Sequence, residues 1–221
     1  MTIDQTTHLP EFDALDDPEN DPGIEYANGQ FTDKRVGVKP SAIATTSLPR
    51  QLCDAQSEAG VEFADGQITE KPASIESNEI AATITALLKF ECRKTRSAKV
   101  YASGQGYQCY PDDPKKFRKP DVSLMLASRV AGMDPQTGLF PFTADLVVEV
   151  ISPTDEAYHV DIKVEEYLSA GFPLLWFVHP ATRTVAIYRA DGTTARLRAN
   201  DDIAGESALP TFRCKVAEFF E

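Results

Sequence analysis

The run from Asp145 to Ile151, Asp-Leu-Val-Val-Glu-Val-Ile, constrains the fold of this chain most strongly. It is rich in β-branched residues and therefore predicts a strand of a buried sheet. Because alternate residues of a strand share a face, Glu149 is expected on the side of Asp145, Val147 and Ile151. The opposite side carries Leu146, Val148 and Val150. A carboxylate in such a strand is costly to bury unless it is paired or binds a metal ion. Glu149 is thus either a ligand or an acid that lies at a sheet edge or is satisfied by an arginine.

Other segments predict the remainder of an α/β domain. Further strands are indicated by runs of β-branched and aromatic residues at Lys99–Ser103, Tyr107–Tyr110, Asp121–Leu126, Leu174–Val178 and Thr184–Tyr188. Two segments instead repeat apolar residues at helical spacing. One starts at Ser74 or Ser77 and carries Ile75 and Ile80, and the other follows Pro153 and ends at Gly171. Helix, strands, helix and strands in this order predict a mixed central sheet flanked by helices.

The first fifty residues differ from the rest in charge. Residues 1–33 hold nine acidic residues and no lysine or arginine, which leaves too little apolar material to order a core alone. The 221 residues, 42% of them hydrophobic, allow one full core. We therefore expect an acidic N-terminal arm over residues 1–50 and one folded domain over residues 51–221.

One internal repeat lies in both the arm and the domain. Residues 24–34, Ile-Glu-Tyr-Ala-Asn-Gly-Gln-Phe-Thr-Asp-Lys, match residues 61–71, Val-Glu-Phe-Ala-Asp-Gly-Gln-Ile-Thr-Glu-Lys, almost position by position. Each copy places Asn-Gly or Asp-Gly between short apolar-alternating runs, which is the strongest local signal for a two-residue hairpin. Two similar β-hairpins are predicted, either as a duplicated structural ribbon or as a recognition element.

Composition argues against several classes of site. The four cysteines form no CxxC pair and the three histidines lie far apart, which disfavours a zinc centre and a Ser-His-Asp arrangement. No stretch approaches the roughly 20 apolar residues of a membrane span, and no signal peptide is recognisable, so a cytoplasmic protein without a membrane partner is expected. The net charge of −12 opposes nucleic-acid binding at long range, although removing the acids of residues 1–33 leaves the remainder close to neutral.

Two further residues join Glu149 as candidates. Asp121 opens the preceding strand, so two strands can deliver one carboxylate each to the same place, as hard cations such as Mg²⁺ require. The alternative for Asp121 is an aspartate in a strand-opening turn. Lys163 lies 14 residues past Glu149, at the margin of the apolar stripe of the second helix. It either reaches back over the strand end or is solvated.

Several motifs occur in order at suitable spacing. They are Lys119-Pro-Asp-Val-Ser-Leu-Met125, Ala144-Asp-Leu-Val-Val-Glu-Val-Ile-Ser-Pro-Thr-Asp155, Lys163-Val-Glu-Glu-Tyr-Leu-Ser-Ala-Gly171, Leu175-Trp-Phe-Val-His-Pro180 and Thr184-Val-Ala-Ile-Tyr-Arg189. This series resembles the Uma2 family, within the PD-(D/E)XK nuclease superfamily, over about residues 55–221. The resemblance implies a restriction-endonuclease-like α/β core in which Asp121 and Glu149 bind Mg²⁺ or Mn²⁺. It also implies that Lys163 replaces the lysine that ordinarily stands two residues after the acid, where this chain has Ile151.

The activity that the resemblance implies is metal-dependent hydrolysis of phosphodiester bonds in nucleic acid, with DNA as the expected partner. The metal would polarise the phosphoryl group and lower the pKa of a bound water, while Lys163 orients that water or stabilises developing charge. Self-association as a homodimer fits the superfamily. Two alternatives stay open: a nuclease-fold binding or regulatory protein without turnover, and a metal-dependent phosphoesterase acting on another substrate.

Weaker signals surround these candidates. Glu76 either faces the site or is a solvated acid favoured by the helix dipole. Many Uma2 members resemble a Ser-x-x-His helix start at Ser77, and no catalytic role is transferred to that serine. Tyr167 is interpreted as core packing. Two segments either contact a substrate backbone or form a hairpin loop and a solvated turn. They are Gly104–Tyr107 and the basic cluster Lys115, Lys116, Arg118 and Lys119.

Overall fold

The computed structural model describes residues 24–27, 30–33, 61–64, 67–70, 74–110, 113, 115–134 and 138–221. Its contacts divide the chain into two units, Met1–Leu48 and Pro49–Glu221. In the first unit, β1 (Ile24–Ala27) pairs with β2 (Gln30–Asp33) as an antiparallel hairpin. In the second unit, β3 (Val61–Ala64) pairs with β4 (Gln67–Glu70) in the equivalent register. The prediction of two similar hairpins is confirmed.

A six-stranded mixed sheet forms the centre of the second unit, in the order β12-β11-β10-β9-β7-β5. Its strands are β5 (Ala98–Ala102), β7 (Val122–Leu126), β9 (Leu146–Val150), β10 (Leu174–His179), β11 (Thr184–Arg189) and β12 (Thr194–Arg198). Strands β9 and β10 are parallel, whereas the other neighbours are antiparallel. A parallel pair needs a long crossover connection, and α3 (Ala157–Ser169) provides it.

Smaller elements complete this unit. Two further sheets pair β6 (Gly106–Tyr107) with β8 (Leu139–Phe140), and β13 (Asp202–Gly205) with β14 (Leu209–Lys215). Two short 3₁₀ helices, η1 (Pro180–Thr182) and η2 (Val216–Phe220), follow β10 and β14. The strand predicted at Tyr107–Tyr110 is thus only the short β6, and β12, β13 and β14 were not predicted from the sequence.

The helix α2 (Ile75–Thr95) begins with a reciprocal cap. The Ser74 Oγ accepts the Ser77 N–H at 3.0 Å, and the Ser77 Oγ accepts the Ser74 N–H at 2.9 Å. Ile80 is buried as predicted, but Ile75 is 89% exposed. At 3.6 residues per turn, the five positions between Ile75 and Ile80 rotate Ile75 by about 140° from the apolar stripe. The assignment of Ile75 to that stripe was wrong.

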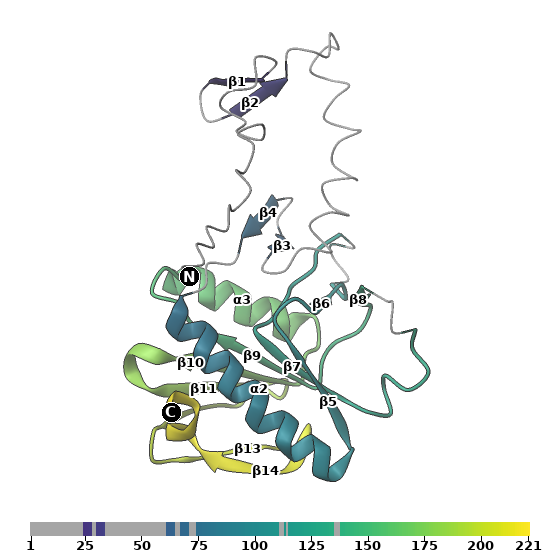
Figure 1. The fold of residues 1–221 in the computed structure, drawn as a ribbon, viewed down its shortest axis with the longest axis vertical. Coiled ribbons are helices and arrows are strands. Elements are labelled where there is room, and N and C mark those ends of the chain that lie inside the picture. Colours follow the sequence, from purple (N-terminus) through teal and green to yellow (C-terminus); the bar gives the residue numbers. More distant parts are fainter. Residues whose placement is uncertain are drawn as a thin grey trace, which may run out of the picture. The chain divides into compact units, whose positions relative to one another are not determined.

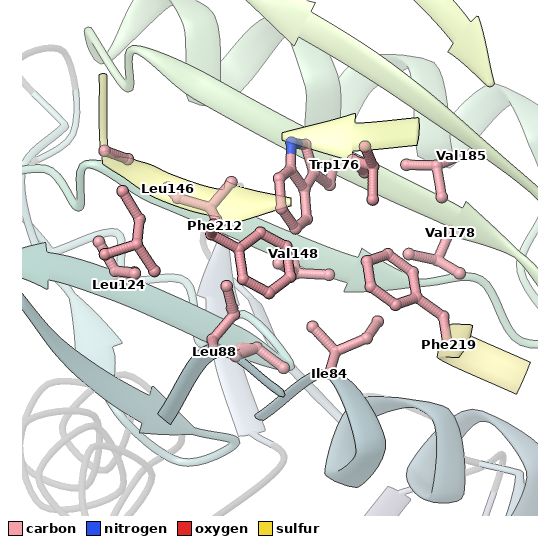
Figure 2. Close-up of a cluster of buried hydrophobic side chains, with 14 of the residues drawn as sticks. Ile84, Leu88, Leu124, Leu146, Val148, Trp176, Val178, Val185, Phe212 and Phe219 are labelled. Atoms are coloured by element: carbon pink, nitrogen blue, oxygen red, sulfur yellow. The ribbon is translucent and has the colours of Figure 1, made fainter. Parts of the chain in front are cut away.

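Two cores lie on opposite faces of the sheet. One joins the buried face of α2 to Val148 and Val150, and it includes the aromatic residues of β14 and η2. Figure 2 shows Ile84 and Leu88 of α2 in this core, together with Trp176 of β10. The other core contains Val147 of β9 and the buried residues of α3. Figure 1 shows α2 and α3 on either side of the sheet.

The C-terminal end of α3 follows the predicted pattern. Gly171 adopts a positive φ of 87° and donates its N–H to the Leu168 carbonyl at 2.9 Å, as a glycine that closes a helix does. Within the described residues, neither helix is long and apolar enough to cross a bilayer.

Candidate active site

Strand register brings the two predicted carboxylates to the same place. In the antiparallel pair of β7 and β9, Val122 lies opposite Val148, so the next position places Asp121 opposite Glu149. Both residues belong to the face of the sheet that α3 covers, because their neighbours in alternation, Ser123 and Val147, are paired on that face. The Val150 N–H donates to the Asp121 Oδ2 at 2.7 Å and holds this carboxylate at the strand end.

Glu149 is buried, with 2% of its surface exposed. The Tyr167 hydroxyl of α3 donates to its Oε1 at 2.7 Å. Burial, reinforced by the negative charge of Glu149, raises the pKa of Tyr167 well above its usual value, so this tyrosine stays protonated. Tyr167 also packs edge-on against Phe172, with ring centroids 4.9 Å apart. The interpretation of Tyr167 as core packing was therefore incomplete, because its hydroxyl orients a candidate ligand.

Lys163 extends from α3 toward the same carboxylate. Its Nζ lies 4.0 Å from the Glu149 Oε1 and 3.6 Å from the Glu62 Oε2, and 20% of its side chain is exposed. The three predicted site residues therefore lie around the C-terminal end of β9, where Asp121 accepts the Val150 N–H and Lys163 forms an ion pair with Glu149. An ammonium at this distance can approach a phosphate or a water molecule bound between the carboxylates.

Glu62 is the site residue that sequence reasoning missed. It lies on β3, is 3% exposed, and accepts the Lys119 backbone N–H at 2.8 Å. Its other oxygen accepts a bond from the Arg118 Nη1 at 2.9 Å and lies near Lys163. The hairpin repeat was noticed, but its pattern predicts only a ribbon and gives no indication that one of its acids is buried against a lysine.

The basic cluster at residues 115–119 is mostly internal. Lys116, Arg118 and Lys119 are buried, and the interpretation as a solvated turn is wrong for these three. Arg118 pairs with Glu62 and Glu166, and Lys116 also pairs with Glu166. Burial opposes the charge of Arg118, but attraction by Glu62 and Glu166 outweighs it and raises the pKa of Arg118 above its usual value. These cations therefore balance internal acids.

The remaining candidates lie outside the site. Glu76 is exposed on α2, which packs on the opposite face of the sheet from Glu149, so it does not join the carboxylates. Ser77 is used in the helix cap. Tyr107 is fully buried and donates its hydroxyl to Ser123 at 2.7 Å, which assigns this part of the Gly104–Tyr107 segment to packing.

The donor chemistry of the site fits a hard divalent cation. Asp121 and Glu149 offer carboxylate oxygens from paired positions, and such oxygens are the preferred ligands of Mg²⁺. Among the described residues, no group of three or more His, Cys, Asp or Glu side chains is arranged to hold a metal ion. A cation here would therefore take two protein carboxylates and complete its shell with water and substrate oxygens, as Mg²⁺ commonly does.

Comparisons with known proteins show the fold and the family of this chain. A solved structure described as a putative nuclease belonging to DUF820, from Anabaena variabilis ATCC 29413, superposes with a TM-score of 0.64 at 19% sequence identity. The match covers 72% of this chain and 89% of that one, and at this identity it shows a shared fold. The search of curated proteins gave no match. The family model of Uma2, described as a putative restriction endonuclease, matches residues 47–217. This chain belongs to the Uma2 family.

Proposed function

We propose that this protein is a metal-dependent endonuclease that hydrolyses phosphodiester bonds, with DNA as its first expected substrate. The observation that carries the proposal is that Asp121 accepts the N–H of Val150, the residue after Glu149, while the Lys163 ammonium lies 4.0 Å from Glu149. We assign the activity to the domain of residues 51–221 and expect it to act as a homodimer in the cytoplasm.

Asp121 and Glu149 would hold Mg²⁺ or Mn²⁺, which when bound polarises a phosphoryl oxygen and lowers the pKa of a coordinated water. The chain's own residues fix the geometry. The Val150 N–H orients Asp121 and the Tyr167 hydroxyl orients Glu149. Lys163 is placed to stabilise charge that develops on the phosphate or to orient the attacking water. Glu62 is a positioning residue, because its carboxylate lies 3.6 Å from the Lys163 ammonium and attracts it.

The test is cleavage of supercoiled plasmid DNA by the purified full chain with Mg²⁺, Mn²⁺ or EDTA. Asp121→Asn and Glu149→Gln should each lower the nicking rate at least about a hundredfold, the scale on which lost transition-state stabilisation is felt. They should also weaken Mn²⁺ binding in calorimetry. The matched controls, Asp161→Asn and Glu165→Gln, alter exposed acids on α3 and should keep the wild-type rate. Metal-independent nicking, or nicking unaffected by both site variants, would contradict the proposal.

One observation favours a second candidate, a nuclease-fold binding protein without turnover. Glu149 already has Tyr167 and Lys163 as partners, so its burial is compensated without a metal ion. This candidate predicts DNA binding by the wild-type protein, no Mn²⁺ binding at Asp121 and Glu149, and no cleavage of plasmid DNA. Hydrolysis of bis(p-nitrophenyl) phosphate without DNA cleavage would instead support a phosphoesterase with another substrate.

A further inference from the structure

Three arginines gather at the free edge of the central sheet. Arg196 and Arg198 alternate on the edge strand β12, and Arg183 precedes β11, the strand beside it. Between and beside them, Ala195 and Leu197 pack toward the core of α2. Alternation therefore places Arg196 and Arg198 on the other face, the face that carries Glu149. We call Arg183, Arg196 and Arg198 the arginine patch.

Strand register relates the arginine patch to the candidate active site. Glu149 pairs with Phe177, Phe177 pairs with Ala186, and Ala186 pairs with Arg196. Arg196 is thus in the same cross-strand row as Glu149, three strands away. At a strand spacing of about 4.8 Å, their backbones lie roughly 14 Å apart. Arg198 lies opposite Thr184, in the next cross-strand row of the same face. This row is nearer the end of the sheet at which Asp121 and Glu149 lie.

The arginines of the patch are not neutralised. Within the part of the chain that the structure describes, none of the three guanidinium groups forms an ion pair. Arg196 contacts the Thr184 hydroxyl at 3.4 Å, and Arg183 stacks over the Phe220 ring at 4.8 Å. Asp201 bonds to the backbone N–H of Arg198. Although the chain has a net charge of −12, three unpaired cations that lie close together repel one another. An anionic partner would offset this repulsion.

The surroundings of the patch suit phosphate groups. A surface depression of about 540 Å³ is lined by the three arginines together with Thr182, Thr184 and Ala199. Threonine hydroxyls can donate to phosphate oxygens, and the planar guanidinium group binds them with two parallel hydrogen bonds. Arg183 also lines a smaller depression that contains the acids Glu76, Glu79 and Glu221. Arg196 and Arg198 are therefore expected to contribute most of the binding.

We propose that the arginine patch binds backbone phosphates of a nucleic-acid strand whose scissile phosphate lies at Asp121 and Glu149. This inference rests on the proposed function for the position of the cut, whereas binding itself can be measured without cleavage. Phosphates follow each other at a rise of about 3.4 Å along one strand. Because this rise is the smallest displacement between successive phosphates, a separation of roughly 14 Å spans at most about four nucleotides. The patch thus engages only substrates that extend up to about four nucleotides to one side of the cut.

The test measures binding of a labelled 30-base-pair duplex to the full chain in EDTA, by fluorescence anisotropy between 50 and 200 mM salt. Arg196→Gln/Arg198→Gln should weaken binding and lower the slope of log K against log salt by about 2, since each phosphate contact contributes about 0.9. The matched control is Arg93→Gln/Arg213→Gln, which removes the same charge from two exposed arginines elsewhere. The control should bind as the wild type does.

Additional arms separate the outcomes. Glu149→Gln should bind the duplex like the wild type while losing cleavage. Binding by the patch can therefore be established even if nuclease activity is never observed. Equal binding by the patch variant and the wild type would overturn the inference, as would no duplex binding by the wild type. Saturation by inorganic phosphate with no added affinity for longer strands would also overturn it, in favour of a free-phosphate site.

Discussion

The buried ionic cluster around Glu149 and the arginine patch use the same kinds of charge in opposite ways. We define the ionic cluster as Glu62, Lys116, Arg118, Glu149, Lys163 and Glu166. Each of its charges has a partner of opposite sign, so the cluster exerts little attraction at a distance. The patch has no ion pair among the described residues and is open to solvent. Paired charges fix the geometry of a site, whereas unpaired ones attract a ligand to it.

This difference also explains how an acidic protein can bind a polyanion. A net charge of −12 describes the whole chain, but local potential depends on where unpaired charges lie. The basic residues that lie close together in sequence, within 115–119, are largely buried and paired with internal acids. The patch is assembled from β12 and from the residue that precedes its neighbour β11. Its contribution should be strong at low salt and weak at high salt, because exposed charges are screened.

The largest difference between the ionic cluster and the arginine patch is expected in how a substitution changes the stability of the protein. Arg118→Met removes the cation between Glu62 and Glu166 and leaves two largely buried carboxylates without their main partner. Breaking a buried pair in this way costs about 3 to 5 kcal/mol of unfolding free energy. Arg196→Met removes an exposed arginine without an ion pair and should change stability by less than about 0.5 kcal/mol. Urea unfolding at pH 7 measures both. Similar losses for the two variants would show that the distinction between the regions is false.

A second contrast concerns orientation of the candidate ligand. Tyr167→Phe removes the hydrogen bond to the buried Glu149 carboxylate, and bonds to charged groups are worth about 1.5 to 3 kcal/mol. Tyr107→Phe is the matched control, because it removes a buried hydroxyl that donates to the neutral Ser123 instead. Both variants should lower stability, but only Tyr167→Phe should weaken Mn²⁺ binding and the nicking rate. If Tyr107→Phe weakens Mn²⁺ binding equally, Tyr167 has a packing role alone.

Much of this architecture could be predicted from local patterns. The apolar strand around Glu149, the strand that begins directly after Asp121 and the glycine that closes α3 each follow from residue type and spacing. The sharing of a face by Val147 and Glu149 follows from alternation alone. These features are set by interactions between residues close in sequence or by the period of a strand.

What could not be predicted depends on contacts between distant segments. Glu62 meets Arg118 and Lys163 across 56 residues or more, and no local pattern encodes that meeting. The burial of Lys119 likewise follows from packing, with its side chain against Phe117. The arginine patch needs the strand order β10-β11-β12, which sequence periodicity did not supply because β12 was not predicted. The sequence therefore identifies charged residues as candidates for a site. The topology of the fold decides which of them form ion pairs.

A third contrast is expected at alkaline pH. Burial raises the pKa of Cys109 to about 11 and that of Cys214 to about 12. In the unfolded chain these thiols ionise near pH 8.5, so the folded state retains more protons and loses stability as pH rises through this range. The loss should stay below about 1 kcal/mol per pH unit, because both thiols are only half-buried and solvent screens them. Arginines keep their charge up to pH 12, so the salt dependence of duplex binding should not change.

The measurement is unfolding by urea from pH 7 to 10, in parallel with anisotropy. Cys109→Ala/Cys214→Ala should flatten the fall in stability above pH 8.5 without altering duplex binding. If duplex binding falls with the same pH dependence as stability in the wild type, the patch and the core are coupled, and the separation of the two regions fails.

The smallest effect should come from exchanging the cations of the patch without removing their charge. Arg196→Lys/Arg198→Lys keeps two positive charges, so the slope of log K against log salt should stay at the wild-type value. Lysine is a point charge and cannot form the two parallel bonds of a guanidinium group, so affinity should fall by a few-fold. Anisotropy in EDTA separates the two quantities. An unchanged affinity would mean that the patch attracts nucleic acid by charge alone. A loss as large as that of Arg196→Gln/Arg198→Gln would mean that guanidinium geometry, rather than unpaired charge, distinguishes the arginine patch from the buried ionic cluster.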